Sequence, residues 1–296
     1  MQQKSQNTNI FAIISFMKKI ILINILLSTL IFANIKAVVS IAPMVSYLKA
    51  IGGDRVDVTL MVKAGSSPHT YEPKPSDMRS LSSADVYYAI GVEFENVWLS
   101  KFQTLNPSMQ IIHTDANITK EYMQNSHNHN QKGHKDPHIW TSIKNIKIIA
   151  THIYKSILKI DSQNALYYKA NYDKFIKHLD SSDKHIQSIL ANTPKGSRFM
   201  VFHPSWGYFA KDYNLTQMPI EIEGKKPKAK EIISIIKEAK KFDVKAIFTQ
   251  PEFSDITAKM IANELHIQVI KVSPLSPHWE ETLLKIANAI AHKDTK

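Results

Sequence analysis

Three histidines stand in turns that can bring an imidazole to the edge of a parallel sheet. They are His69 in Ser-Ser-Pro-His-Thr-Tyr-Glu-Pro, His138 in Lys-Asp-Pro-His-Ile-Trp and His203 in Val-Phe-His-Pro-Ser-Trp. The apolar runs Val56–Val62 and Phe199–Phe202 lead into the first and the third of these turns. Neutral imidazole is a borderline ligand that suits Zn²⁺, and three of them make up most of a tetrahedral site. Metal binding is therefore the first hypothesis.

Each of these histidines also has an ordinary structural interpretation. His69 could be a surface turn residue, His138 a loop residue, and His203 a buried side chain that is hydrogen-bonded to a carbonyl. The sequence contains no His-Glu-x-x-His, no Gly-x-Ser-x-Gly and no Gly-rich phosphate loop, so it does not indicate a metalloprotease, a serine hydrolase or a nucleotide site. The joint position of the three histidines in both halves of the chain is what favours a shared metal site.

A polar loop before His138 holds a second group of histidines. Residues 120–137 include His127, His129 and His134, and the stretch that contains them has almost no apolar side chains. Such a loop is expected to be flexible, and its histidines could bind a metal weakly and pass it to a rigid site nearby. The alternative is a variable loop without a metal-binding role.

The elements that must position these residues alternate between strands and helices. The predicted strands are 38–41, 56–62, 86–90, 199–202, 218–222, 246–249 and 268–272. The predicted helices between them are 43–51, 76–84, 206–213, 228–242, 256–265 and 278–292. This alternation predicts βαβ units and an α/β fold whose two lobes hold mostly parallel sheets flanked by helices. Ligands in such folds bind at the carboxyl ends of the strands, here in the cleft between the lobes.

A stretch without proline or glycine separates the two halves, from Pro137 to Pro194. Apolar residues recur at helical spacing on both sides of Asp161, which predicts two helices. The second, 161–193, would span roughly 45 Å and would bridge the lobes. The predicted domains are thus an N-terminal lobe at 38–160 that includes the loop 120–137, the linking helix, and a C-terminal lobe at 194–296.

The N-terminus predicts export. Lys18 and Lys19 precede an apolar run from Ile20 to Ala33, and Ala37 offers a small residue for cleavage, so residues 1–37 are typical of a signal peptide. Met17 is an alternative start, and a retained anchor helix is the alternative to cleavage. The chain has no cysteine, which excludes both disulfides and a lipid-modified cysteine. We predict a periplasmic protein.

The charge of the chain says little about partners. The formal net charge is +11, and setting aside the four lysines of residues 1–37 leaves about +7. The remaining lysines alternate with acidic residues along predicted helices, which is typical of solvated helix faces. We therefore expect no nucleic-acid partner.

Several of these segments resemble a known family, the solute-binding proteins of metal-specific ABC importers, and the zinc-uptake (ZnuA-type) members in particular. The resemblance covers nearly all of the chain after residue 37. It depends on five segments that occur in the family's order: His69-Thr70-Tyr71-Glu72-Pro73, Pro75-Ser76-Asp77, Asp136-Pro137-His138-Ile139-Trp140, Val201-Phe202-His203 and Glu223-Gly224-Lys225-Lys226-Pro227. It implies two α/β lobes bridged by a long helix, with the metal between them.

The resemblance also bears on the metal and its ligands. Manganese-binding relatives carry a carboxylate where this chain has His203, and a third imidazole shifts the preference towards Zn²⁺. Many relatives have an aspartate ligand before a Pro-Leu pair, where this chain has Ser273. Three neutral ligands would give a zinc site a net charge of +2, unless nearby carboxylates such as Glu221 and Glu223 help. The fourth position is left to water, to a loop histidine or to Glu72.

We therefore predict a periplasmic, high-affinity zinc-binding protein that delivers Zn²⁺ to an inner-membrane ABC permease. It would act as a monomer and catalyse no reaction, with His69, His138 and His203 as the metal ligands. The auxiliary candidates are Glu72 and the loop histidines. The alternatives are the same role for Mn²⁺, Ni²⁺ or Cu²⁺, a three-histidine zinc hydrolase or hydratase, and a metal-dependent adhesin or sensor.

Overall fold

The computed structural model of the chain describes residues 34–123, 134–222 and 224–291. His127, His129 and Glu223 lie outside the described residues, as does nearly all of the predicted leader. The first strand begins at Ile35, so the last three residues that were assigned to the leader lie in a strand whose Ile35 and Ala37 are buried. Cleavage of the leader stays a prediction.

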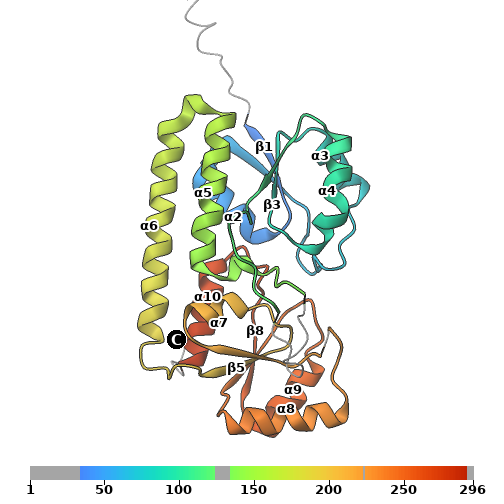
Figure 1. Cartoon of the computed structure of the whole chain (residues 1–296), viewed down its shortest axis with the longest axis vertical. Helices are drawn as coiled ribbons and strands as arrows, with labels where there is room; N and C mark the ends of the chain where they lie inside the picture. Colours follow the sequence, from blue (N-terminus) through green and yellow to red (C-terminus); the bar gives the residue numbers. More distant parts are fainter. Residues whose placement is uncertain (1–33, 124–133, 223, 292–296) are drawn as a thin grey trace, which may run out of the picture. The chain divides into compact units, whose positions relative to one another are not determined.

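The first lobe is built on a four-stranded parallel sheet in the order β2-β1-β3-β4 (Figure 1). Its strands are β1 (Ile35–Val39), β2 (Val56–Leu60), β3 (Val86–Ala89) and β4 (Gln110–His113). The connecting helices are α2 (Ala42–Gly52), α3 (Pro75–Ser82) and α4 (Glu93–Leu105). All residues of β3, and all residues of β1 except Lys36, are buried, as expected for the inner strands of a parallel sheet covered on both faces.

The second lobe repeats this strand order in its own sheet, β6-β5-β7-β8, and all its neighbouring strands are parallel. Its strands are β5 (Arg198–Val201), β6 (Thr216–Pro219), β7 (Ala246–Thr249) and β8 (Gln268–Lys271). Its helices are α7 (Gly207–Asp212), α8 (Ala229–Lys241), α9 (Ile256–Leu265) and α10 (Trp279–Ile290). The predicted α/β architecture with two parallel sheets is thereby confirmed.

In the sequence, two long helices separate the strands of the first sheet from those of the second: α5 (Ile143–Ile160) and α6 (Ala165–Ile189). The two helices lie side by side (Figure 1). α6 has 25 residues and is shorter than the predicted 161–193. A 3₁₀ turn at Ser162–Asn164 precedes it, and the Asp161 carboxylate fastens that turn by accepting hydrogen bonds from Asn164 Nδ2 (2.7 Å) and the Tyr168 hydroxyl (2.6 Å). α6 packs against α2 and α5 and also against α10.

Two elements of the first lobe have no counterpart in the sequence prediction, α4 and the edge strand β4. β4 is four residues long and its side chains are exposed or half-buried, so it carries little hydrophobic signal. α4 begins with Glu93, which proves to matter at the candidate site. Among the described residues, no helix has both the length and the apolar character needed to cross a bilayer.

Candidate metal centre

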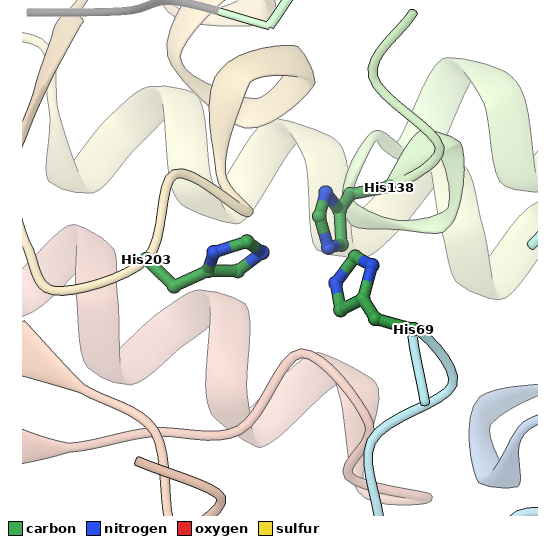
Figure 2. A group of neighbouring side chains, drawn as sticks. All are labelled: His69, His138 and His203. Atoms are coloured by element: carbon green, nitrogen blue, oxygen red, sulfur yellow. The ribbon is translucent and has the colours of Figure 1, made fainter. Parts of the chain in front are cut away.

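The imidazoles of His69, His138 and His203 converge on one point (Figure 2). One ring nitrogen of each can be chosen so that all three lie within 4.8 Å of one another. The ring centroids are 5.1 to 5.7 Å apart, and each pair of rings is close to edge-on. The three predicted ligands, which lie far apart in the sequence, are thus brought together by the fold.

The His69 turn follows β2 and is fixed by the helix after it. Lys74 N–H donates to Asp77 Oδ2 (2.8 Å), and the Tyr71 hydroxyl donates to the same oxygen (2.6 Å). The Tyr71 ring also packs edge-on against Phe94 of α4, with centroids 5.0 Å apart. His69 therefore reaches the site on a proline-containing turn that α3 and α4 hold in place.

The His138 turn precedes α5 and is organised by one carboxylate. Asp136 Oδ1 accepts a hydrogen bond from the His138 backbone N–H (2.9 Å) and another from His138 Nδ1 (2.7 Å). The Thr141 hydroxyl donates to the His138 carbonyl (2.9 Å), and Ser142 caps α5 by accepting from Asn145 N–H (3.2 Å). The His138 ring is buried, so this turn holds it with little freedom.

His203 lies two residues after the inner strand β5. Its ring stacks on Phe253 (centroids 5.1 Å apart, planes at 25°), and its Nδ1 lies 2.7 Å from Glu221 Oε1. Gln250 Nε2 donates to the His203 carbonyl (2.9 Å). His203 Nε2 is buried and, among the described residues, has no hydrogen-bond partner. A metal ligand before its ion is bound has this arrangement.

Each of the three histidines has a carboxylate at Nδ1. Glu93 Oε1 lies 2.9 Å from His69 Nδ1, as Asp136 and Glu221 lie beside the other two rings. A carboxylate accepts hydrogen bonds, so each Nδ1 carries the proton and each Nε2 presents its lone pair. Zn–N bonds of about 2.0–2.1 Å in a tetrahedral arrangement would place the ring centres roughly 5 Å apart, which matches the observed spacing.

These carboxylates change the predicted charge of the centre. The ligands alone would give a zinc-loaded site +2, whereas three ionised carboxylates at Nδ1 bring the sum to −1. Glu221 was anticipated as a source of negative field; Glu93 was not. The sequence feature that could have identified Glu93 is its place at the start of a helix, four residues after the end of β3, where a parallel sheet binds its ligands.

The surroundings shift the protonation of two of the rings in opposite directions. Burial lowers the pKa of His138, which favours the neutral form that binds a metal. Burial would also lower the pKa of His69, but the hydrogen bond and the charge of Glu93 outweigh it, so the His69 pKa lies above its ordinary 6.5. As the pH falls, protons therefore compete with a metal for His69 before they compete for His138.

The other candidate ligands lie outside the three-histidine group. Glu72 is exposed and lines a cavity of about 400 Å³ together with Glu252. The Ser273 hydroxyl faces Glu252 Oε1 at 3.3 Å and accepts from Leu275 N–H (3.1 Å). His134 is exposed at the base of the loop. Roles for Glu72, His134 and the undescribed His127 and His129 stay predictions.

Comparison with known proteins finds relatives over most of the chain. The family model described as zinc-uptake complex component A, periplasmic, matches residues 37–292. Zinc-binding protein AdcA of Streptococcus pyogenes is 29% identical over 270 residues, which cover 84% of this chain and 52% of AdcA. The manganese ABC transporter substrate-binding lipoprotein PsaA of Streptococcus anginosus is 26% identical over 250 residues, covering 80% and 78%. The chain thus spans about half the length of the AdcA proteins that it matches.

Solved structures of similar fold include a crystal structure of ZnuA, which is 38% identical with a TM-score of 0.81 and covers 88% of this chain and 98% of that one. A ZnuA deletion mutant with zinc bound is 37% identical with a TM-score of 0.80, covering 89% and 99%.

Proposed function

Because the chain belongs to the family of the periplasmic zinc-uptake complex component A, we propose that it binds Zn²⁺ in the periplasm and delivers it to an ABC permease of the inner membrane. One observation carries the proposal. His69, His138 and His203 present their ligand nitrogens within 4.8 Å of one another, and a carboxylate holds each ring at its other nitrogen. This is the arrangement that binds a borderline divalent ion through imidazole.

Zinc is the proposed ion because the ligand group consists of imidazoles alone. Mn²⁺ prefers carboxylate, carbonyl and water oxygens, and the described residues place no carboxylate in the three-histidine group. The relatives are named for zinc in AdcA and for manganese in PsaA, so the choice between these ions depends on the ligands of this chain. The predicted leader and the periplasmic family support the proposed compartment.

The function is a binding function. The names of the relatives describe a zinc-binding protein, a substrate-binding lipoprotein and a component of an uptake complex. Release of the ion to a permease requires that the centre can open, and the ligands come from both lobes. The loop histidines could assist capture, and the protein is expected to act as a monomer.

A competitive metal titration tests the proposal. The purified chain is expected to bind one Zn²⁺ tightly and to prefer it over Mn²⁺. His69→Ala and His203→Ala should each weaken zinc binding by about 100- to 1,000-fold, because each removes one of three nitrogen ligands. His185→Ala is the matched control, since His185 is exposed on α6 away from the three-histidine group. Tight binding that survives both ligand substitutions would move the site elsewhere and refute the ligand assignment.

A further inference from the structure

Helix α7 connects the His203 loop directly to the His138 turn. It begins at Gly207, four residues after His203, and the segment between them is fixed by Gln217. Gln217 Oε1 accepts from Trp206 N–H (3.0 Å), and Gln217 Nε2 donates to the Pro204 carbonyl (3.4 Å). His203 and the first turn of α7 therefore move together.

One hydroxyl of α7 joins this segment to the carboxylate residue that orients His138. The Tyr208 hydroxyl donates to the Asp136 carbonyl (2.8 Å) and accepts from Glu121 N–H (3.1 Å). Asp136 N–H in turn donates to the Glu121 carbonyl (2.8 Å), so one tyrosine oxygen closes the base of the histidine-containing loop. Tyr208 is 5% exposed, and removing its hydroxyl would leave a donor and an acceptor unpaired in a largely dry contact.

Close packing supports the same contact. A Cβ added at Gly207 would lie 2.9 Å from Asp136 Oδ2, so glycine is what lets the start of α7 approach the carboxylate. Asp136 is thereby held from two directions, by its own hydrogen bonds to His138 and by the backbone of α7. A displacement of the Asp136 carboxylate would carry the His138 ring with it.

Polar contacts along the outer side of α7 continue the connection. Lys211 forms an ion pair with Glu121. The Ser142 hydroxyl donates to Asp212 Oδ2 (2.5 Å), and Lys144 Nζ lies 3.0 Å from Asp212 Oδ1. The exposed ion pairs contribute little free energy individually, so the buried Tyr208 contact should dominate.

On the basis of the proposed zinc-binding function, we propose that α7 is a latch between the lobes and that Tyr208 is a positioning residue for His138. The hydroxyl holds Asp136, and Asp136 holds the His138 ring in the orientation that a metal requires. Withdrawal of His203 from His138 moves α7 away from the Asp136 turn and breaks the Tyr208 hydrogen bonds. The latch therefore has to open before the ion leaves, and it sets the rate of release.

Tyr208→Phe tests the latch while it keeps the buried ring. Zn²⁺ release is measured by stopped-flow mixing of the zinc-loaded chain with excess chelator, and the geometry of the site by the visible spectrum of the Co²⁺-loaded chain. We expect release about tenfold faster, because a hydroxyl that makes two hydrogen bonds is lost, together with an altered Co²⁺ spectrum. Tyr213→Phe is the matched control: it removes a hydroxyl next to α7 that donates to Asp183 Oδ1 of α6 (2.8 Å).

The control is expected to lower the melting temperature and to leave zinc release and the Co²⁺ spectrum unchanged. Equal effects of the two substitutions on release, or an unchanged rate and spectrum in Tyr208→Phe, would overturn the latch. Gly207→Ala provides a second test should Tyr208→Phe fold poorly, and it should shift the Co²⁺ spectrum by displacing Asp136. Failure of the unsubstituted chain to bind Zn²⁺ would instead refute the proposed function itself.

Discussion

The two lobes share a strand order but bury different polar side chains at the carboxyl ends of their strands. In the second lobe, Gln250 is 1% exposed and donates to the His203 carbonyl and to Ser205 Oγ, both at 2.9 Å. In the first lobe, Glu95 is 2% exposed, lies two residues after Glu93, and accepts from Gly91 N–H (2.7 Å). The buried side chain is thus a neutral amide, Gln250, in the second lobe and a titratable carboxyl group, Glu95, in the first lobe. We therefore expect pH to act on the first lobe more than on the second.

The histidines themselves differ in the same sense. The His203 side chain is 11% exposed and stacks on Phe253, whereas the His69 side chain is 27% exposed on a turn. The carboxylates paired with these two histidines differ in exposure in the same way: the Glu221 side chain is 6% exposed and the Glu93 side chain is 42% exposed. The second lobe thus offers a preformed ligand in His203, and the first lobe offers, besides the buried His138, a ligand that solvent reaches in His69.

The largest expected effect concerns Glu95 and stability. Burial raises its pKa from the ordinary 4.5 to about 7, although hydrogen bonds from Ser40 and from the backbone of Ile90 and Gly91 oppose the shift. Between these two values the folded chain keeps a proton that the unfolded chain has lost. The free energy of unfolding should therefore fall as the pH rises from 4.5 to 7, by roughly 3 kcal/mol from this group.

Urea denaturation of the chain and of Glu95→Gln at both ends of this pH range measures that contribution. The difference in the free energy of unfolding between the two proteins should change by roughly 3 kcal/mol between pH 4.5 and pH 7, because glutamine does not titrate. The reciprocal Gln250→Glu should introduce a dependence of the same sign into the second lobe. An identical pH dependence in the chain and in Glu95→Gln would remove this distinction between the lobes.

The next effect concerns the buried carboxylate of the second lobe. Glu221→Gln keeps the shape of the side chain and removes its charge from the His203 ring, so zinc affinity should fall about 10- to 100-fold. Competition with a chelator of known affinity, at fixed pH and salt, gives the change. Unchanged affinity would mean that the stacking on Phe253 suffices to hold His203.

The matching substitution in the first lobe, Glu93→Gln, should lower zinc affinity by a smaller factor. Glu93→Gln also removes a charge beside an imidazole, but this pair is partly exposed and is screened by water and salt more than the buried pair of Glu221 and His203, so we expect a loss of about two- to fivefold. The same competition assay compares it with Glu221→Gln. A loss as large as that of Glu221→Gln would show that exposure does not distinguish the two sites.

The smallest expected effect is on the dimensions of the protein. α6 packs against α2 and α5 and also against α10, which restricts the separation of the lobes. The radius of gyration measured by X-ray scattering should change by less than about 1 Å when zinc binds. A change of several ångströms would indicate wide closure and would contradict the restriction.

The sequence predicted the fold class, and the three histidines that it singled out lie together in the structure, because both depend on local patterns. Apolar runs such as Val56–Val62 mark strands, and a histidine after such a run lies at the binding edge of a parallel sheet. The resemblance to the metal-importer family covered the same segments. Element ends were less accurate, as at α6, whose first turn is replaced by a 3₁₀ turn fastened by Asp161.

Contacts between segments that are distant in the chain could not be predicted from the sequence. Glu93 and His69 are 24 positions apart, and their pairing requires the register of α4 against the His69 turn. The same holds for Tyr208 and Asp136, which meet only when the two lobes are assembled. Helical and strand periodicities describe which face of an element is buried but not which element covers it.

The contacts of α6 also bear on how the molecule unfolds. Asn171 donates to the Ile51 carbonyl (3.2 Å) in the first lobe, whereas His178 and Ser182 both contact the Glu280 carboxylate of α10. Loss of structure in either lobe would expose apolar side chains of α6 that the other lobe does not cover. The two lobes should therefore melt in a single cooperative transition, although each has its own sheet.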